Sequence, residues 1–327
     1  MGRLTIPMLS GNRARQEREP ALCRPVVHVS KAGRGVAAWP AASAAVTGRG
    51  RAPERLGEGM ASQTREIAAR DGTRLVSKLT GTGPARVALV HSLAMDHSFW
   101  GPVVERLAAE ATVLTFDCRG HGASGKPPGP YTAELFADDL ADLFDGIGWA
   151  SAVVAGASMG GCVSLAFAGR HRDRLAGLGL FDTTAWYGPD APAQWAERAD
   201  KALKDGLAGL VDFQKIRWFG DAFRNAHPDV VAASIAVFLR NDVNAYAETC
   251  RMLGAADLRA VLPAIKVPTR IVVGAEDHAT PPAMAEALHA GIAGSMKTVY
   301  AGGRHLTPLE MPDRVADDLR RIIAAVG

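Results

Sequence analysis

The run Gly156-Ala157-Ser158-Met159-Gly160 has the pattern Gly-x-Ser-x-Gly, in which the serine can act as a nucleophile. The residues before it are apolar and favour a strand, whereas residues 159–170 favour a helix, so the serine is expected on a sharp strand-to-helix turn. Such a turn exposes the hydroxyl group and strains the backbone, and the flanking positions must be small. The N–H of Met159 would then point to where an oxyanion forms. The run therefore predicts that Ser158 is a nucleophile.

The same run permits a second interpretation. A glycine-rich turn after a strand can cradle the pyrophosphate of a dinucleotide, as in short-chain dehydrogenases. Such an enzyme would have the turn near the start of the domain and a Tyr-x-x-x-Lys motif downstream. No tyrosine of the chain is followed by lysine four residues later; the residues found there are Leu135, Ala191, Cys250 and Arg304. The sequence therefore favours the nucleophile.

Other polar motifs stand at the ends of predicted strands. They are His91-Ser92-Leu93, the run from Asp117 to Ser124, Gly274-Ala275-Glu276-Asp277 and Gly303-Arg304-His305. Ligands bind outside the carboxyl ends of the strands in open α/β sheets, so these motifs are expected to lie near one site.

Alternating strand and helix patterns run from Ser62 to the end of the chain. Strands are expected at 65–69, 73–79, 85–91, 112–117, 152–156, 175–181, 268–273 and 296–300. Helices are expected at 98–110, 132–144, 159–170, 282–290 and 312–326. This alternation predicts an α/β fold with a mostly parallel central sheet and helices on both faces.

Residues 185–266 interrupt this alternation. Helical patterns occur at 193–206, 207–218, 230–239 and 244–253, without a convincing strand. About eighty residues are too many for a loop, so we expect a helical cap over the carboxyl ends of the strands. The expected division is an N-terminal segment at 1–60, core at 61–184, the cap at 185–266 and core at 267–327.

Length and composition indicate one large α/β domain, with or without an insertion. The chain has 327 residues, of which 48% are hydrophobic. No apolar stretch approaches the ~18 residues of a transmembrane helix, so no membrane partner is expected. The four cysteines (Cys23, Cys118, Cys162 and Cys250) lack metal-ligand spacing, which favours reduced thiols, a cytoplasmic location and no metal site.

The first sixty residues differ in composition from the rest. They hold ten Lys and Arg against four Asp and Glu, a charge of +6, whereas the whole chain carries +3 and the remainder therefore −3. We expect this segment to be disordered because of its composition. Glu17 and Glu19 are atypical of a transit peptide, so we expect an over-extended start and a functional protein that begins at Met60. The mildly acidic remainder gives no indication of nucleic-acid binding.

From about residue 65 to its end, the chain resembles the α/β-hydrolase superfamily. The order Ser158, Asp277, His305 is the Ser…Asp…His order of that fold. The resemblance implies that His305 accepts the serine proton and returns it to the leaving group, while Asp277 orients the imidazole and stabilises its charge. It also places a second oxyanion donor, the N–H of Leu93, beside that of Met159. It implies no cofactor.

Asp182 is an alternative acid, because some members of the superfamily carry the acid after the strand at 175–181. We favour Asp277, because Gly-x-x-Asp followed by a short helix and the histidine strand is the commoner pattern. Asp117, Arg119 and His121 are expected to order their own loop through hydrogen bonds.

Two positions depart from the pattern of the superfamily. His91-Ser92 stands where His-Gly is usual, which would alter the turn that carries Leu93. Arg304 precedes His305 where glycine is frequent, and its charge would lower the pKa of His305 unless the side chain pointed into solvent.

Within the superfamily, the chain most resembles 3-oxoadipate enol-lactonases. The shared motifs are His91-Ser92-Leu93, Pro128-Gly129-Pro130-Tyr131-Thr132, Asp182-Thr183-Thr184-Ala185, Arg217-Trp218-Phe219 and Ala256-Asp257-Leu258-Arg259. The resemblance implies a serine hydrolase that opens a lactone or cleaves an ester through an acyl-enzyme. An anionic substrate would need a cation, for which Arg217 beside Trp218 is the candidate. The alternative is that Arg217 is solvated and Trp218 belongs to the core.

Other functions also fit the resemblance. A general carboxylesterase and a cofactor-free haloperoxidase or perhydrolase would use the same side chains. A slow-turnover or non-catalytic ligand-binding protein would retain the fold and the pocket. The expected partner is a small-molecule ester or lactone, and a homo-oligomer is compatible with the sequence.

Overall fold

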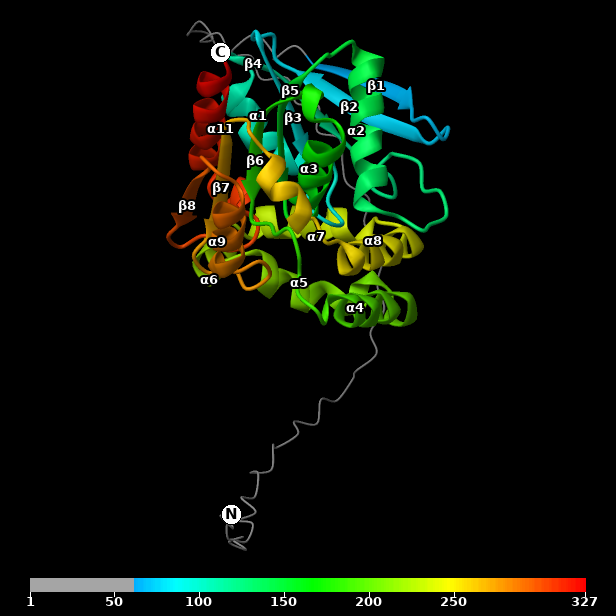
Figure 1. The fold of residues 1–327 in the computed structure, drawn as a ribbon. Helices are drawn as coiled ribbons and strands as arrows, with labels where there is room; N and C mark the ends of the chain where they lie inside the picture. The colour runs from blue at the N-terminus through cyan, green and yellow to red at the C-terminus, as the bar shows by residue number, and fades with distance from the viewer. Residues whose placement is uncertain (1–61) are drawn as a thin grey trace, which may run out of the picture. The chain divides into compact units, whose positions relative to one another are not determined.

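The computed structural model describes residues 62–327, so the predicted N-terminal segment lies outside the described residues (Figure 1). Eight strands form one sheet in the order β1-β2-β4-β3-β5-β6-β7-β8. Their bounds are β1 Ser62–Ala68, β2 Arg74–Thr80, β3 Ala85–Val90, β4 Ala111–Phe116, β5 Ala152–Ala157, β6 Leu175–Phe181, β7 Thr269–Gly274 and β8 Met296–Tyr300. The pairs β1–β2 and β2–β4 are antiparallel, and the remaining pairs are parallel. The mostly parallel sheet predicted from the sequence is confirmed.

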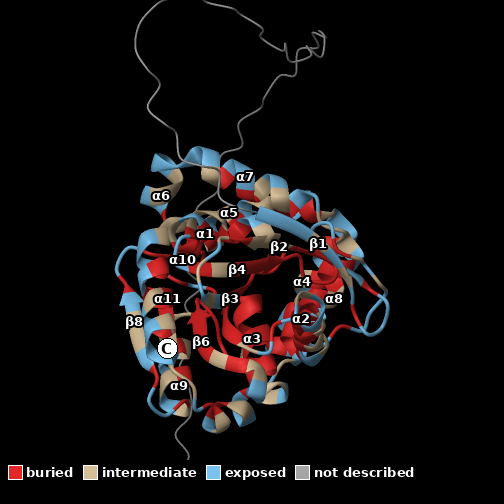
Figure 2. Cartoon of the chain, turned by 90° about the horizontal axis from the view of Figure 1, so that it is seen from above, coloured by how far each residue is buried: buried red, intermediate tan, exposed pale blue. Residues whose placement is uncertain are grey.

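The inner strands have no polar face, because helices cover the sheet on both sides. All six residues of β5 are buried, whereas most of the edge strand β1 is exposed. Helices α1 (Gly101–Leu107) and α11 (Pro312–Val326) pack together on one face. Helices α2 (Ala133–Ile147) and α3 (Met159–Arg170) pack together on the other (Figure 2).

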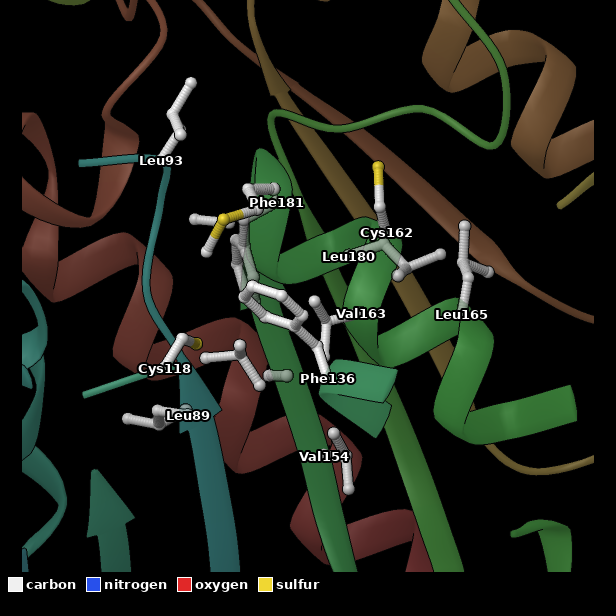
Figure 3. Packing of buried hydrophobic residues seen from close by; sticks show 14 of the residues in the cluster. Leu89, Leu93, Cys118, Phe136, Val154, Cys162, Val163, Leu165, Leu180 and Phe181 are labelled. Carbon is white, nitrogen blue, oxygen red and sulfur yellow. The ribbon is translucent and has the colours of Figure 1, made fainter. Parts of the chain in front are cut away.

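Apolar side chains fix α3 against the sheet. Val163 of α3, Val154 of β5 and Leu180 of β6 are fully excluded from solvent (Figure 3). Burial of one such side chain contributes about 1.5–3 kcal/mol to folding. This packing holds the amino end of α3, where Ser158 lies, in place against the sheet.

The predicted helix at 98–110 is divided in the structure. A 3-10 turn at His97–Trp100 precedes α1, which ends at Leu107. Pro102 lies in the first turn of α1. Pro102 has no N–H group to donate to a carbonyl of the preceding turn, so the hydrogen bonds of α1 do not continue into residues 97–100.

Helices α4 to α8 lie between β6 and β7 and gather at one end of the sheet (Figure 1). They are α4 Ala191–Asp205, α5 Val211–Trp218, α6 Asp221–Ala226, α7 Pro228–Leu239 and α8 Val243–Ala255. The short helix α6 was not predicted. All five fall within 185–266, and the division into core and cap at those boundaries remains our proposal. No helix within residues 62–327 is long and apolar enough to cross a bilayer.

Candidate active site

Ser158 joins β5 to α3 with φ 53° and ψ −116°. A positive φ is rare for a residue with a side chain and costs about 1–3 kcal/mol, so neighbouring contacts must hold it. The N–H of Ser158 donates to the carbonyl of Phe181 at 2.9 Å. The hydroxyl of Thr183 donates to the carbonyl of Ser158 at 2.6 Å. The end of β6 therefore clamps the strained turn from both sides.

Two glycines allow the turn to form. A Cβ atom on Gly156 would lie 2.0 Å from the carbonyl oxygen of Gly160. A Cβ atom on Gly160 would lie 2.1 Å from the carbonyl oxygen of Val90 in β3. Both contacts involve backbone atoms, which cannot move aside as a flexible side chain can. The glycines predicted to flank the serine are thus required by close backbone approach.

Ser158, His305 and Asp277 form a chain of hydrogen bonds. The Nε2 atom of His305 lies 2.9 Å from Oγ of Ser158, and its Nδ1 atom lies 2.8 Å from Oδ2 of Asp277. The three residues are 6%, 4% and 2% exposed, respectively. The structure thus brings the three side chains together, and a buried imidazole between a hydroxyl and a carboxylate can move a proton from the hydroxyl.

Several donors surround the carboxyl group of Asp277. Its Oδ1 atom accepts from the N–H groups of Ala279 and Thr280, at 2.7 and 3.0 Å. Its Oδ2 atom accepts from the hydroxyl of Thr280 at 2.8 Å. Burial opposes its charge, but the charge of His305 and these hydrogen bonds hold the pKa of Asp277 below its usual value. Asp277 is therefore ionised at neutral pH.

Asp182, the alternative acid, is occupied elsewhere. It accepts hydrogen bonds from the N–H of Gly274 and from both the N–H and the hydroxyl of Thr307. Within residues 62–327, no hydrogen bond joins it to His305. Burial, and then the charge of Asp277, raise its pKa. The carboxyl group that contacts the imidazole is that of Asp277.

Two backbone donors lie near Ser158 with their hydrogens free. In the part of the chain that the structure describes, the N–H groups of Leu93 and Met159 have no hydrogen-bond acceptor. Leu93 follows β3 (Figure 3) and lines the cavity at Ser158. The imidazole of His91 holds this loop, since its Nε2 accepts from the N–H of Cys118 at 3.0 Å and its Nδ1 lies 2.8 Å from the carbonyl oxygen of Ser92.

A cavity opens from Ser158 toward the cap. The inner part is lined by Ser92, Leu93, Ser158, Tyr187, Trp195, Arg198, Arg217, Trp218, Ala279, Thr280 and His305. An outer chamber of about 650 Å³ continues between α4, α5 and the start of α9 (Pro282–Gly291). The inner part and the outer chamber are adjacent, since Tyr187, Trp195, Arg198, Arg217 and Ala279 line both.

Two arginines line both parts of this cavity. Nε of Arg198 donates to the hydroxyl of Tyr246 at 2.7 Å, and its guanidinium lies 4.9 Å from the ring centroid of Trp195. The guanidinium of Arg217 lies 5.5 Å from the ring centroid of Phe213. Within residues 62–327, neither arginine pairs with a carboxylate. Burial and the charge of Arg198 lower the pKa of Arg217. Two such cations can attract an anion.

Arg217 was predicted as a substrate contact, but Arg198 was not. A signal was present, because Arg198 falls among Trp195, Ala199 and Ala202 on the buried face of α4. An arginine on that face indicates a polar cavity. Trp218 fits both earlier interpretations, since it is 3% exposed and also lines the cavity.

Arg304 is directed to the base of the cap. Its side chain donates to the carbonyl of Ile216 at 2.9 Å and to a carboxylate oxygen of Glu276 at 3.3 Å. The side chain is buried and does not point into solvent, which was one of the cases considered from the sequence, and Glu276 supplies a counter-charge.

The loop after β4 is ordered by its own polar residues, as expected. Asp117 accepts from the N–H of His97 and of Ala123, at 2.8 and 2.7 Å. Arg119 forms a buried ion pair with Asp139. Among residues 62–327, no group of three His, Cys, Asp or Glu side chains is arranged to hold a metal ion.

Comparison with known proteins places these features in context. A sequence model of the alpha/beta hydrolase family matches residues 87–318. The 3-oxoadipate enol-lactonase 1 of Acinetobacter baylyi is 29% identical over 252 residues, which cover 76% of this chain and 92% of that protein. The enol-lactonase from Burkholderia xenovorans, whose crystal structure is known, is 35% identical in sequence with a TM-score of 0.76. The match covers 80% of this chain and 100% of the enol-lactonase chain. A thermophilic esterase from Thermogutta terrifontis is 33% identical, with a TM-score of 0.76, and covers 81% and 99%.

Proposed function

The chain belongs to the alpha/beta hydrolase family, and from this premise we propose that it is a serine hydrolase that cleaves a carboxylic ester or a lactone. The resemblance and the fold predicted from the sequence are confirmed by the family match and the structural neighbours. The observation that carries the proposal is the buried chain of hydrogen bonds from Ser158 through His305 to Asp277. These side chains are the ones that acyl transfer to serine requires.

In the first half of the proposed reaction, Nε2 of His305 accepts the proton of Ser158 while Oγ attacks the substrate carbonyl carbon. The carbonyl oxygen becomes negatively charged, and the N–H groups of Leu93 and Met159 stabilise it. His305 then donates its proton to the leaving oxygen as the carbon–oxygen bond breaks. The product of this half is an acyl-enzyme on Ser158.

In the second half, water replaces the leaving group. His305 accepts a proton from the water, whose oxygen attacks the acyl carbon, and then returns a proton to Oγ of Ser158. Asp277 holds the imidazole in the tautomer that accepts at Nε2 and stabilises its charged form. The acid is released and the serine hydroxyl is restored.

For the substrate, we propose a lactone or ester that carries a second, anionic group, with 3-oxoadipate enol-lactone as the first to test. Such a lactone uses one carboxyl group of the diacid in its ring and leaves the other free. Arg198 and Arg217 support this choice, because they face the cavity at Ser158 without a carboxylate partner within residues 62–327. Opening the ring gives an enol, whose oxygen has received its proton from His305 and which stays attached to the acyl group. Tautomerisation of the enol and hydrolysis of the acyl-enzyme then give the oxo-diacid.

The outer chamber favours a second candidate. Its volume of about 650 Å³ is typical of sites for drug-sized ligands, which are larger than 3-oxoadipate enol-lactone. Leu210, Phe213 and Met284 line the chamber. A carboxylesterase that takes a bulkier acyl or leaving group would use this space, with the same catalytic side chains.

A substrate panel tests both candidates. Purified protein and its Ser158→Ala variant are assayed in parallel on 3-oxoadipate enol-lactone, an uncharged lactone of similar size, and neutral aryl esters of increasing chain length. Hydrolysis of the enol-lactone that is lost in the variant supports the lactonase. Hydrolysis of aryl esters alone replaces it with the carboxylesterase. Equal rates with wild type and variant would overturn the serine mechanism.

A further inference from the structure

We propose that Asp182 is a positioning residue that keeps the loops carrying Asp277 and His305 in register with Ser158; this inference rests on the proposed function. Asp182 stands at the end of β6, between the acid and the nucleophile in the sheet order. It makes no contact with the reacting atoms in the proposed mechanism, so it acts only through the residues it holds.

Asp182 binds both loops at once. Its Oδ1 atom accepts from the N–H of Gly274 at 3.0 Å, three residues before Asp277. Its Oδ2 atom accepts from the N–H and the hydroxyl of Thr307, at 3.0 and 2.6 Å, two residues after His305. A single carboxyl group thereby links the last residue of β7, from which the Asp277 loop departs, to the segment after β8 that carries His305.

The residues on either side of Asp182 hold the nucleophile. The carbonyl of Phe181 accepts from the N–H of Ser158, and the hydroxyl of Thr183 donates to the carbonyl of Ser158. The N–H of Asp182 itself donates to the carbonyl of Val272 at 2.8 Å. The tripeptide Phe181–Thr183 therefore contacts the backbone around each of the three residues that would perform the reaction.

Burial and backbone geometry argue that this arrangement is demanding. Asp182 is 0% exposed and has φ 48°, a conformation that residues other than glycine seldom adopt. A second carboxyl group buried near Asp277 disfavours folding, because burial and like charge both oppose ionisation. Its hydrogen bonds to two catalytic loops account for a residue that would otherwise be costly.

Two conservative substitutions remove parts of this link. Thr307→Val deletes the hydroxyl donor and preserves the shape of the side chain. Asp182→Asn preserves the shape of the carboxyl group but leaves one acceptor oxygen, so its NH₂ group must face a backbone N–H. Thr269→Val is the matched control, because the buried Thr269 hydroxyl donates to the carbonyl of Val267 at the opposite end of β7.

Three measurements follow on the full chain. The first is the split between kcat and KM on the best ester found. The second is the low-field proton NMR signal of the His305 Nδ1–H that faces Asp277. The third is the melting temperature. We expect Thr307→Val and Asp182→Asn to lower kcat by about 10-fold or more with KM within about 2-fold, since small misplacements of reacting groups are costly, and to shift or broaden the signal. Thr269→Val is expected to change only the melting temperature.

A wild-type kcat and a wild-type signal in folded Thr307→Val would overturn the inference, even if Asp182→Asn failed to fold. A fall in kcat that tracks the melting temperature equally in Thr307→Val and Thr269→Val would also overturn it, because the role would then be structural only. If wild-type protein hydrolyses no ester or lactone, the proposed function fails instead. The NMR signal needs no substrate and would still test the positioning of His305 and Asp277.

Discussion

Nε2 of His305 lies 2.9 Å from Oγ of Ser158, although the two residues are 147 positions apart in the chain. The parallel strands produce this proximity, because β5 is followed in the sheet by β6, β7 and β8. Their carboxyl ends lie along one edge of the sheet, where the loops that carry Ser158, Asp277 and His305 meet.

Ser158→Ala and His305→Ala are each expected to lower kcat by about 10⁴-fold or more. The double variant should fall no further, because the two side chains act as a unit. Steady-state kinetics on the best substrate of the panel, together with labelling of Ser158 by an organophosphonate, check this. Strictly additive losses would contradict a shared proton transfer.

Asp277→Asn is expected to lower kcat by about 10⁴-fold, the loss known for the equivalent change in serine proteases. The amide cannot hold the imidazole in the tautomer that accepts the serine proton. The comparison variant is Asp117→Asn, which alters another buried carboxylate that pairs with a histidine, His97, outside the cavity. Retention of most activity in Asp277→Asn would reassign the acid.

Much of the core could be predicted because apolar periodicity decides it. The predicted bounds of α3, β6 and α11 coincide with the structure, and both helices pack against β6 in the sheet. Ser158, Asp277 and His305 could be assigned because each lies in the loop within about five residues of the end of a predicted strand. The roles of these three residues remain predictions until the kinetics are measured.

The cavity and its supports could not be predicted because they depend on tertiary contacts. Arg198 is significant only where α4 packs against α8 and places it beside Tyr246. From the sequence, Asp182 was an alternative acid. Its hydrogen bonds to Gly274 and Thr307 join residues far apart in the chain, so the sequence could not predict them. The side chain of Arg304 is fixed by Glu276 and by the carbonyl of Ile216 in the cap.

Arg198→Met and Arg217→Met are expected to raise KM about 10-fold or more for a substrate with a free carboxylate, because a charge-assisted hydrogen bond contributes about 1.5–3 kcal/mol. KM for a neutral ester should change little. Arg251→Met is the control, because this cap arginine already pairs with Glu248. An equal rise in KM for charged and neutral substrates would argue against an anion site.

His121 makes stability depend on pH. Burial lowers its pKa to about 3, whereas an unfolded histidine titrates near ~6.5. The unfolded state therefore binds the extra proton between these values, and stability present above about pH 6.5 is lost as the pH falls, by up to about 1.4 kcal/mol per pH unit. His121→Phe should show a shallower decline than wild type in urea unfolding from pH 7 to pH 4, and the exposed His278→Phe should not. A slope unchanged in His121→Phe would show that other groups cause the decline.

Gly160→Ala is expected to destabilise the protein by about 3 kcal/mol or more, because overpacking against backbone cannot be relieved by a rotamer change. The added Cβ atom would lie 2.1 Å from the carbonyl oxygen of Val90, so α3 and β3 would have to separate. Gly101→Ala is the matched control, since a Cβ atom there meets nothing within 4 Å and the residue has helical geometry. That change should alter stability by less than about 1 kcal/mol, because the gain in helix propensity is opposed by the preference of a residue before proline, here Pro102, for extended backbone. Urea unfolding of both variants measures the difference in stability. A Gly160→Ala protein as stable as wild type would show that the turn between β5 and α3 can relax and that its glycines are not sterically required.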